Sequence, residues 1–299
     1  AGGDTERPMV FLAVAGVINV ILNLILVIVF HLDVAGVAIA TIVSQYISCF
    51  LVIRCLTKEK GPLHLDLKGL RIDPMILKNI ATIGLPAGLQ GMVFSMSNMV
   101  IQSSINSFGD VVMAGSGAAA NIEGFVYVSM NAFYQTCLTF TGQNYGAGKP
   151  KRVDRVITLC LAFVTVSGIL CGALAYVFAD PLLHIYSPSD EVVAQGIVRM
   201  TYVCLPYFLC GLMDTLVGGL RGLGTSIVPM CVSIIGVCGF RLVWIFTVFQ
   251  AVRTPPCLYI SYPVSWIATA IIHACCLLVV RKKAYKRMDY SAETASTTA

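Results

Sequence analysis

The side chains of this sequence that could hold or move an ion lie inside apolar stretches long enough to cross a membrane. Two of them are acidic, Asp214 and Glu123, and a third, Arg241, is basic. Ionisable groups at membrane depth are costly and are functional candidates by default. A carboxylate shielded from water also takes up a proton more readily than one in solution. We therefore predict that Asp214 and Glu123 bind a coupling proton or Na⁺. The alternative is that Arg241 forms an ion pair with one of them that only holds helices together.

Polar residues recur around both acids with the periodicity of a helix. Three of them follow Glu123 at intervals of four, and at 100° per residue Tyr207 shares a helical face with Asp214. We interpret these stripes as the lining of a water-accessible cavity that binds a substrate. The alternative is a set of interhelical hydrogen bonds worth about 1 kcal/mol each. The candidate cavity residues are Gln90, Phe94, Ser97, Tyr127, Asn131, Gln135 and Tyr207.

The elements that carry these residues are predicted to be transmembrane helices. Only 12% of the 299 residues are charged, against about 25% in a soluble domain, and the mean hydropathy is +0.83. The apolar stretches approach the roughly 20 residues that a membrane helix needs, and they lack the polar alternation of barrel strands. We predict an all-α polytopic membrane protein. Its eight spans lie at approximately 9–30, 34–55, 79–106, 112–138, 156–179, 194–218, 229–250 and 258–280.

Charge alternates between the segments that connect these spans. Lys and Arg concentrate after the second, fourth, sixth and eighth spans, whereas the opposite connections carry mainly Asp and Glu. Since Lys- and Arg-rich connections remain cytoplasmic, both ends of the chain are predicted to be cytoplasmic and the protein to lie in the plasma or inner membrane. The formal net charge of +5 therefore belongs to the membrane edges and does not indicate a nucleic-acid partner.

A polar segment at 57–78 divides the spans into two groups. Residues 1–56 hold two helices, residues 79–288 hold six, and the small polar residues of 289–299 are predicted to be disordered. We interpret 57–78 as a cytoplasmic linker that contains a short amphipathic piece and joins two helical bundles.

A short motif opens the first span and recurs at the seventh. Residues 3–9 and 224–230 both consist of Gly, two polar residues, two variable residues and Pro-Met. Both copies lie on the side predicted to be cytoplasmic, which is typical of a transporter with two parallel halves. If the halves are equal, four spans precede the chain and the complete protein has about twelve. The start without an initiator Met also indicates a fragment.

Enzyme and metal signatures are absent from the sequence. Its 12 cysteines are scattered, without a Cys-x-x-Cys pair or a Cys/His cluster at metal spacing. Residues 142–149 resemble a phosphate-binding loop, but the spacing is one residue too long and Pro150 replaces the required Ser or Thr. We interpret the segment as a Gly-rich helix end. We predict no enzymatic activity and no cofactor beyond Na⁺ or H⁺ as the coupling ion.

Four segments, in their order along the chain, resemble the multidrug and toxic compound extrusion (MATE) family of transporters. They are 3–9 with Asn19 and 36–45, then 83–86, 142–149 and 220–230. The resemblance implies two six-helix bundles around a central cavity and alternating access. It implies export of amphipathic, often cationic compounds, driven by entry of Na⁺ or H⁺. It also implies that the chain begins just before the family's fifth helix and ends after its twelfth.

The sequence departs from the family at two acidic positions. Family members with a cation site in this half carry Glu on the helix that begins with Gly-Leu-Pro, but the matching neighbourhood around Gln90 has no acid. Asn23 stands where the fifth helix often carries Asp. Asp214 falls in the tenth family helix, where such members also place an acid, so the resemblance leaves it as the main coupling candidate.

The resemblance implies small amphipathic or cationic molecules and the lipid bilayer as partners, and a monomer when complete. A flippase for lipid-linked oligosaccharides would share the helix plan. It needs a strongly cationic cavity, whereas the cations at depth are Arg241 and Arg199. A non-transporting membrane scaffold is a further alternative. We do not expect the chain to transport without the four additional helices.

Overall fold

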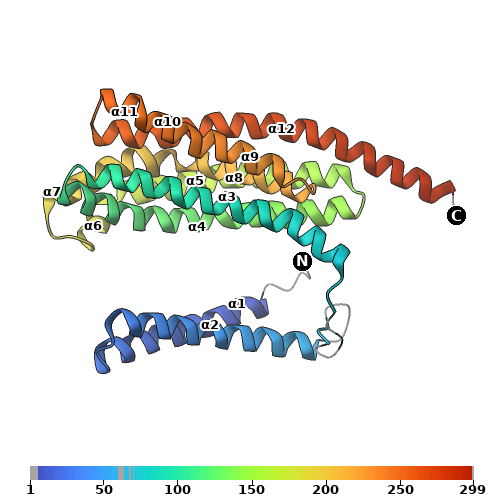
Figure 1. The fold of residues 1–299 in the computed structure, drawn as a ribbon, viewed down its shortest axis with the longest axis horizontal. Helices are drawn as coiled ribbons and strands as arrows, with labels where there is room; N and C mark the ends of the chain where they lie inside the picture. Colours follow the sequence, from blue (N-terminus) through green and yellow to red (C-terminus); the bar gives the residue numbers. More distant parts are fainter. Residues whose placement is uncertain (1–5, 60–63, 67–68, 70, 298–299) are drawn as a thin grey trace. The chain divides into compact units, whose positions relative to one another are not determined.

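The computed structural model describes residues 6–59, 64–66, 69 and 71–297, with side chains as far as Lys286. Every regular element within these residues is a helix (Figure 1). The longer helices are α1 (Glu6–Leu24), α2 (Asp33–Lys58), α3 (Pro74–Asn106), α4 (Asp110–Gly146), α5 (Pro150–Val177), α7 (Asp190–Arg199), α8 (Phe208–Gly222) and α12 (Pro255–Thr297). The shorter elements are α6 (Ala179–His184), α9 (Ile227–Ser233), α10 (Phe240–Phe246), α11 (Val248–Ala251) and the π- or 3₁₀-helical turns η1 (Ile25–Val29), η2 (Met200–Cys204), η3 (Leu205–Tyr207) and η4 (Ile234–Gly239).

Eight helical runs in the described residues are long and apolar enough to cross a membrane, which confirms the predicted span count and the all-α class. Most of the helices extend beyond the predicted spans at both ends; for example, the span predicted at 112–138 is observed as Asp110–Gly146. At the C-terminus, where 289–299 were predicted to be disordered, α12 continues to Thr297. Hydropathy detects the apolar part of a helix, whereas extending an existing helix into polar sequence needs no new nucleation.

The chain divides into two compact units, residues 1–74 and 75–299. The boundary falls inside the predicted linker 57–78. The described part of the connection between α2 and α3 contains no helix, and the rest of the predicted amphipathic piece lies outside the described residues.

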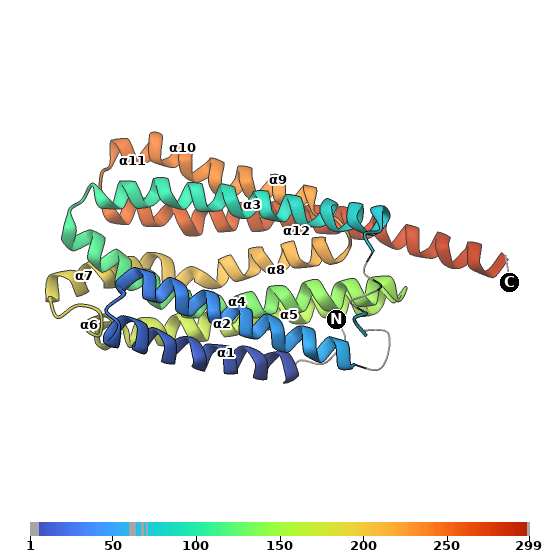
Figure 2. The same cartoon turned by 60° about the horizontal axis from the view of Figure 1, so that its bottom comes forward.

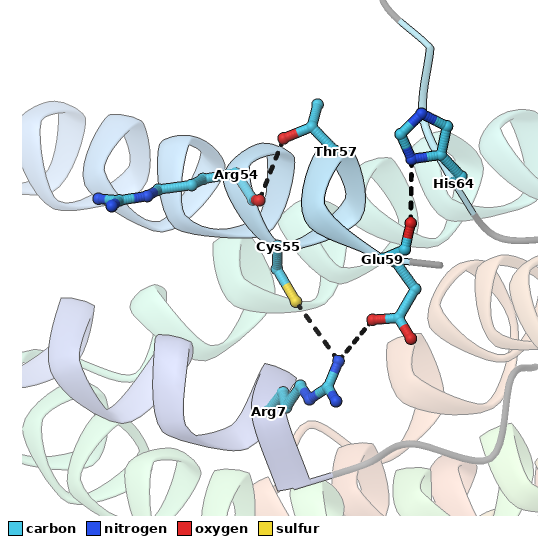
Figure 3. Close-up of polar contacts among 6 residues, drawn as sticks. All are labelled: Arg7, Arg54, Cys55, Thr57, Glu59 and His64. Atoms are coloured by element: carbon cyan, nitrogen blue, oxygen red, sulfur yellow. Dashed lines mark hydrogen bonds and ion pairs between the residues drawn. The ribbon is translucent and has the colours of Figure 1, made fainter. Parts of the chain in front are cut away.

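In the first unit α1 continues through η1 and pairs with α2. The amide of Asn23 donates to Oδ1 of Asn19 at 3.0 Å, and Nδ2 of Asn19 donates to Oγ of Ser44 at 3.2 Å. At the linker end of the same pair Arg7 forms an ion pair with Glu59 at 2.5 Å (Figure 3). These contacts at two levels fix the register of α1 against α2.

The second unit is organised around α4 and α8, which pack side by side (Figure 1, Figure 2). Glycines of α8 permit this approach. A Cβ on Gly218 would lie 2.8 Å from the carbonyl oxygen of Tyr134, and one on Gly222 would lie 2.6 Å from Cβ of Thr141. Because membrane helices associate by close packing at small residues, these glycines hold α8 against α4.

Glycines with left-handed backbone conformation follow two of the helices. Gly148 has φ 65° just after α4, and Gly224 has φ 81° between α8 and α9. The segment 142–149 is thus the C-terminal end of a helix and the turn after it, as the sequence indicated. In the two copies of the internal motif, Pro8 and Pro229 are each the third residue of their helix, where the missing N–H is tolerated.

Two spans of the second unit change their helical winding at membrane depth, which the hydropathy pattern did not predict. Between α7 and α8 the chain passes through η2 and then η3, which contains Pro206. Between α9 and α10 it passes through η4. Such rewinding is frequent at functional sites. Here Tyr207 lies in η3, and Arg241 lies in the first turn of α10.

Candidate functional site

A cavity of about 470 Å³ lies within the second unit. Its walls come from α3, α4, η3, α8, α10 and α12, so both rewound spans contribute to it. Small-molecule sites usually occupy about 300–1,000 Å³ and combine apolar walls with a few polar groups. The cavity therefore has the size of a site for a small organic molecule.

One wall of the cavity is aromatic. Tyr207 packs edge-on against Tyr127 and Trp266, with ring centroids 6.4 and 5.2 Å away. Trp266 packs in the same way against Tyr262, at 5.8 Å. Phe94 also lines the cavity, from α3. Aromatic side chains supply large apolar surfaces with few rotatable bonds, so this wall suits a flat, partly apolar ligand.

Three charged side chains line the cavity: Asp214 and Arg221 on α8, and Arg241 on α10. Asp214 makes no hydrogen bond or ion pair of standard geometry with any residue that the structure describes. A carboxylate at membrane depth without a fixed partner can exchange a proton, a metal cation or a cationic ligand with the cavity.

Arg221 lies in the last turn of α8 and lines the cavity, although it follows the end of the sixth predicted span, 194–218, and was therefore counted with the basic residues after that span. Its Nη1 donates to the hydroxyl of Tyr134 at 2.6 Å, and its Nη2 donates to Oε1 of Gln90 at 2.8 Å. These two bonds join α8 to α4 and α3. Both terminal nitrogens of Arg221 are therefore bonded to the cavity wall, whereas its Nε is buried without a hydrogen-bond partner among the described residues.

Arg241 is buried, with 3% of its surface exposed. Its guanidinium carbon lies 4.1 Å from the ring centroid of Tyr262, and its Nε donates to Oγ of Ser265 at 3.1 Å. The ion pair of Arg241 with Asp214 or Glu123, which was the alternative interpretation of the sequence, is absent from the described residues. Sequence alone could not choose the pairing, because it does not show which helices pack together.

Glu123 lies outside the cavity and is paired with Arg199, which the sequence did not single out as its partner. Arg199 donates through Nε and Nη2 to the two carboxylate oxygens at 2.9 and 2.8 Å, and through Nη1 to Oγ of Ser116 at 2.8 Å. Its guanidinium also lies 5.6 Å from the ring of Tyr259. Both charged side chains are buried. This ion pair joins α4 to α7, and of the two acids only Asp214 lines the cavity.

The structure brings most of the predicted cavity residues together and separates two of them. Those that line the cavity with Asp214 are Gln90, Phe94, Tyr127, Asn131 and Tyr207. Ser97 is buried outside the lining, and Gln135 is exposed. Four residues exceed one helical turn by about 40°, so a stripe with an interval of four drifts about 120° from Glu123 to Gln135. Only the middle of that stripe can face one cavity.

Several lining residues were not foreseen from the sequence. They include Asn98, Tyr134, Tyr262 and Trp266. Tyr134 follows Tyr127 by seven residues, a spacing that returns to the same helical face and could have identified it. The aromatic residues of α12 had no such signal, because an aromatic residue in an apolar helix is equally typical of a core position.

The described residues contain no group of three His, Cys, Asp or Glu side chains placed to share a metal ion. What the cavity offers is non-covalent binding: aromatic surface, amide groups, one carboxylate without a fixed partner and two guanidinium groups. Polar groups of this kind fix the orientation of a ligand, and the aromatic wall supplies contact area.

In the described residues, eight apolar spans with a polar cavity among the last six define a polytopic membrane protein of the transporter type. The sequence model of the MatE family matches residues 86–247, more than half of the chain. The chain belongs to the MatE family, whose members are membrane transporters and not enzymes. The predicted resemblance to MATE transporters is thereby confirmed.

Individual relatives agree with this assignment. The chain is 29% identical over 235 residues to the probable multidrug resistance protein YpnP of Bacillus subtilis, covering 78% of this chain and 52% of the relative. It is 28% identical over 199 residues to the FAD transporter of Shewanella oneidensis, covering 64% of this chain and 43% of the relative. The chain thus spans roughly half the length of these curated relatives.

A solved structure shows the shared fold. The crystal structure of the Vibrio cholerae MATE transporter VcmN in the bent form matches with a TM-score of 0.77 at 22% identity. The match covers 96% of this chain and 64% of that one.

Proposed function

We propose that this chain carries the ion-coupling and substrate-binding cavity of a secondary active exporter of small amphipathic molecules. The observation that carries the proposal is the cavity of the second unit, where the partnerless carboxylate of Asp214 lies among aromatic side chains. Membership of the MatE family supports it, as do the names of relatives, which include multidrug resistance proteins and an FAD transporter.

Asp214 is the coupling group in this proposal. A proton or Na⁺ on its carboxylate removes one negative charge from the cavity and competes with any cationic group of the substrate. By linkage, the substrate then weakens binding of the coupling ion to the same extent. Antiport follows when the cavity alternates between the two sides of the membrane, with both chain ends in the cytoplasm.

A flippase for lipid-linked oligosaccharides is the second candidate. Such a flippase needs cavity cations to bind pyrophosphate. Arg221 is available for this because it lines the cavity, whereas Arg199 is not, because Glu123 neutralises it. Two arginines and one aspartate leave the lining with one net positive charge (2 − 1). A pyrophosphate carries more negative charge than this lining can neutralise, so the exporter is favoured.

Flux measurements in proteoliposomes test the proposal. We would reconstitute the protein that contains this chain, impose a proton or Na⁺ gradient and measure movement of an ethidium-like dye. We expect gradient-driven flux in the wild type and its loss in Asp214→Asn, with Asp110→Asn as the control because Asp110 is exposed at the start of α4. Gradient-driven flux at the wild-type rate in Asp214→Asn would overturn the coupling role. Absence of any wild-type flux would favour a scaffold.

A further inference from the structure

The charge of the cavity differs from that expected of a site for simple cations. Its lining has two guanidinium groups against one carboxylate. One of them, Arg221, is bonded to Tyr134 and Gln90 on neighbouring helices. In the other, Arg241, both terminal nitrogens lack a side-chain partner among the described residues, and its environment indicates what else the cavity can receive.

Arg241 uses one of its donor groups on the protein. Nε is bonded to Ser265, and no side chain that the structure describes accepts a hydrogen bond from Nη1 or Nη2. The flat face of the guanidinium lies over Tyr262, at 4.1 Å, and near Trp266, at 5.8 Å. Rings below the group offset part of the cost of burying a cation, but they leave the in-plane donors available toward the cavity.

Arg199 is an arginine of the same unit in which all three guanidinium nitrogens donate hydrogen bonds to the protein. Its Nε and Nη2 hold both oxygens of Glu123, and its Nη1 holds Ser116. Arg199 and Arg241 are buried to a similar degree, with 6% and 3% of their surfaces exposed. Both lie beside tyrosines of α12. The difference is that an oxyanion from the protein completes the first guanidinium and none completes the second.

We propose that the cavity binds planar aromatic zwitterions, with the oxyanion of the ligand on Arg241 and its cationic group on Asp214. The forked donors of a guanidinium match the two oxygens of a carboxylate or phosphate. The rings of Tyr207, Tyr262 and Trp266 provide the stacking surface between the two charged ends. This inference rests on the proposed function, because it assigns the substrate class of the same cavity.

The zwitterion is compatible with coupling at Asp214. Its cationic group competes with the coupling ion for the carboxylate, as antiport requires, while its oxyanion adds affinity at a group that the coupling ion does not occupy. Arg241 is therefore a specificity-determining residue. It selects for an oxyanion without taking part in ion exchange.

A matched pair of dyes tests the oxyanion subsite. Rhodamine 110 has a free carboxylate, and rhodamine 123 is its methyl ester, so the two share one cationic xanthene ring system. We would titrate each dye with the purified protein in dodecylmaltoside micelles and follow fluorescence polarisation. We expect the wild type to bind the free acid about tenfold to a hundredfold more tightly than the ester, as for a hydrogen bond to a charged group.

Variants assign the preference to its residue. Arg241→Gln should remove the preference, so that the free acid binds no more tightly than the ester, and continued binding of the ester shows that the variant is folded. Asp214→Asn should weaken both dyes equally and preserve their ratio. Arg253→Gln, an exposed cation outside the cavity, is the control and should change neither dye. Should Arg241→Gln lose both dyes, Arg241→Lys decides, because it keeps the charge and should keep a reduced preference for the free acid.

Three results would overturn the inference. They are binding of the acid by the wild type no tighter than that of the ester, an unchanged ratio in Arg241→Gln and, where Arg241→Gln binds neither dye, no preference in Arg241→Lys. Displacement of the acid by dihexanoyl phosphatidylcholine as readily as by unlabelled aromatic zwitterion would also overturn it. That lipid supplies an oxyanion and a cation without a ring. These measurements use no ion gradient, so they can fail while Asp214-dependent transport stands, and the reverse also holds.

Discussion

Two charged sites of the second unit contain the same kinds of side chain and differ in what completes them. In one, Glu123 and Arg199 form a bidentate pair that is also bonded to Ser116. In the other, Asp214 and Arg241 line a cavity, and neither has an opposite charge at ion-pair distance among the described residues. A charge at membrane depth is therefore not by itself a sign of transport chemistry. The informative property is whether the protein already satisfies the charge.

The two sites are only one helical turn apart along α4. Glu123 belongs to the closed pair, and Tyr127, four residues later, lines the cavity. The offset of about 40° between such positions is enough to turn one toward α7 and the other toward the cavity. The Glu123–Arg199 pair thus lies on the side of α4 that faces α7 and not the cavity. It joins α4 to α7 beside the cavity.

The largest expected effect comes from opening the closed pair. Glu123→Gln leaves Arg199 buried without its counter-ion, and breaking a buried pair in this way costs about 3–5 kcal/mol. We expect a strongly lowered thermal unfolding midpoint in detergent, with poor yield of folded protein. Glu123→Asp is the control, since it keeps the charge. An unfolding midpoint for Glu123→Gln equal to that of the wild type would show that the pair does not stabilise the packing of α4 against α7.

A double variant separates the cost of an unpaired charge from the loss of the pair. Replacing both partners by well-packed apolar residues of similar volume is often neutral or stabilising, by about 1–4 kcal/mol. Glu123→Met with Arg199→Met should therefore be more stable than Glu123→Gln alone. A double variant that is less stable than the single one would mean that Ser116 and Tyr259 depend on the charges themselves.

A smaller effect is expected at Arg221, the cavity arginine whose two terminal nitrogens are bonded to neighbouring helices. Gln90→Leu removes the acceptor of Nη2 of Arg221, a bond to a charged group worth about 1.5 kcal/mol. Arg221 is only half-buried, so water in the cavity replaces part of this loss. We expect a modest decrease of the unfolding midpoint, and Gln90→Glu should restore it. A decrease of the unfolding midpoint as large as that of Glu123→Gln would mean that Arg221 depends on Gln90 as strongly as Arg199 depends on Glu123.

The sequence predicted the spans and the stripe on α4 because both follow from simple periodicities. Tyr127 and Asn131 were found by spacing, and Asp214 was found because an acid is rare in an apolar helix. The partner of Glu123 could not be found, since Arg199 is 76 residues away and the contact depends on which helices pack together. Arg221 was misplaced because a basic residue near a helix end looks like a cytoplasmic flank. The rewound turns that contain Tyr207 and precede Arg241 could not be detected from hydropathy, because they change backbone winding and not side-chain polarity.

The ring beneath Arg241 should have a smaller effect still. Tyr262→Leu removes the aromatic face at 4.1 Å, and a cation–π contact contributes about 0.5–2 kcal/mol. Tyr262→Phe keeps the face and serves as the matched control, so the stability difference between the two variants isolates the contact. We expect Leu to lower the unfolding midpoint relative to Phe. Equal midpoints would mean that Ser265 and the cavity, and not the ring, hold the guanidinium.

Asp214→Asn should have the smallest effect on stability, although it has the largest expected effect on transport. The substitution removes a carboxylate that has no bonded partner among the described residues, so no directional contact is lost. It removes some attraction to Arg221 on the same helix, and it also removes the cost of keeping an unpaired charge at membrane depth. These opposing contributions should leave the free energy of unfolding within about 0.5 kcal/mol of the wild type, as for a substitution that breaks no contact. The unfolding midpoint in detergent checks this directly. A stable, inactive Asp214→Asn beside an unstable Glu123→Gln would establish that one acid serves exchange and the other serves the fold, whereas a strongly destabilised Asp214→Asn would remove that distinction.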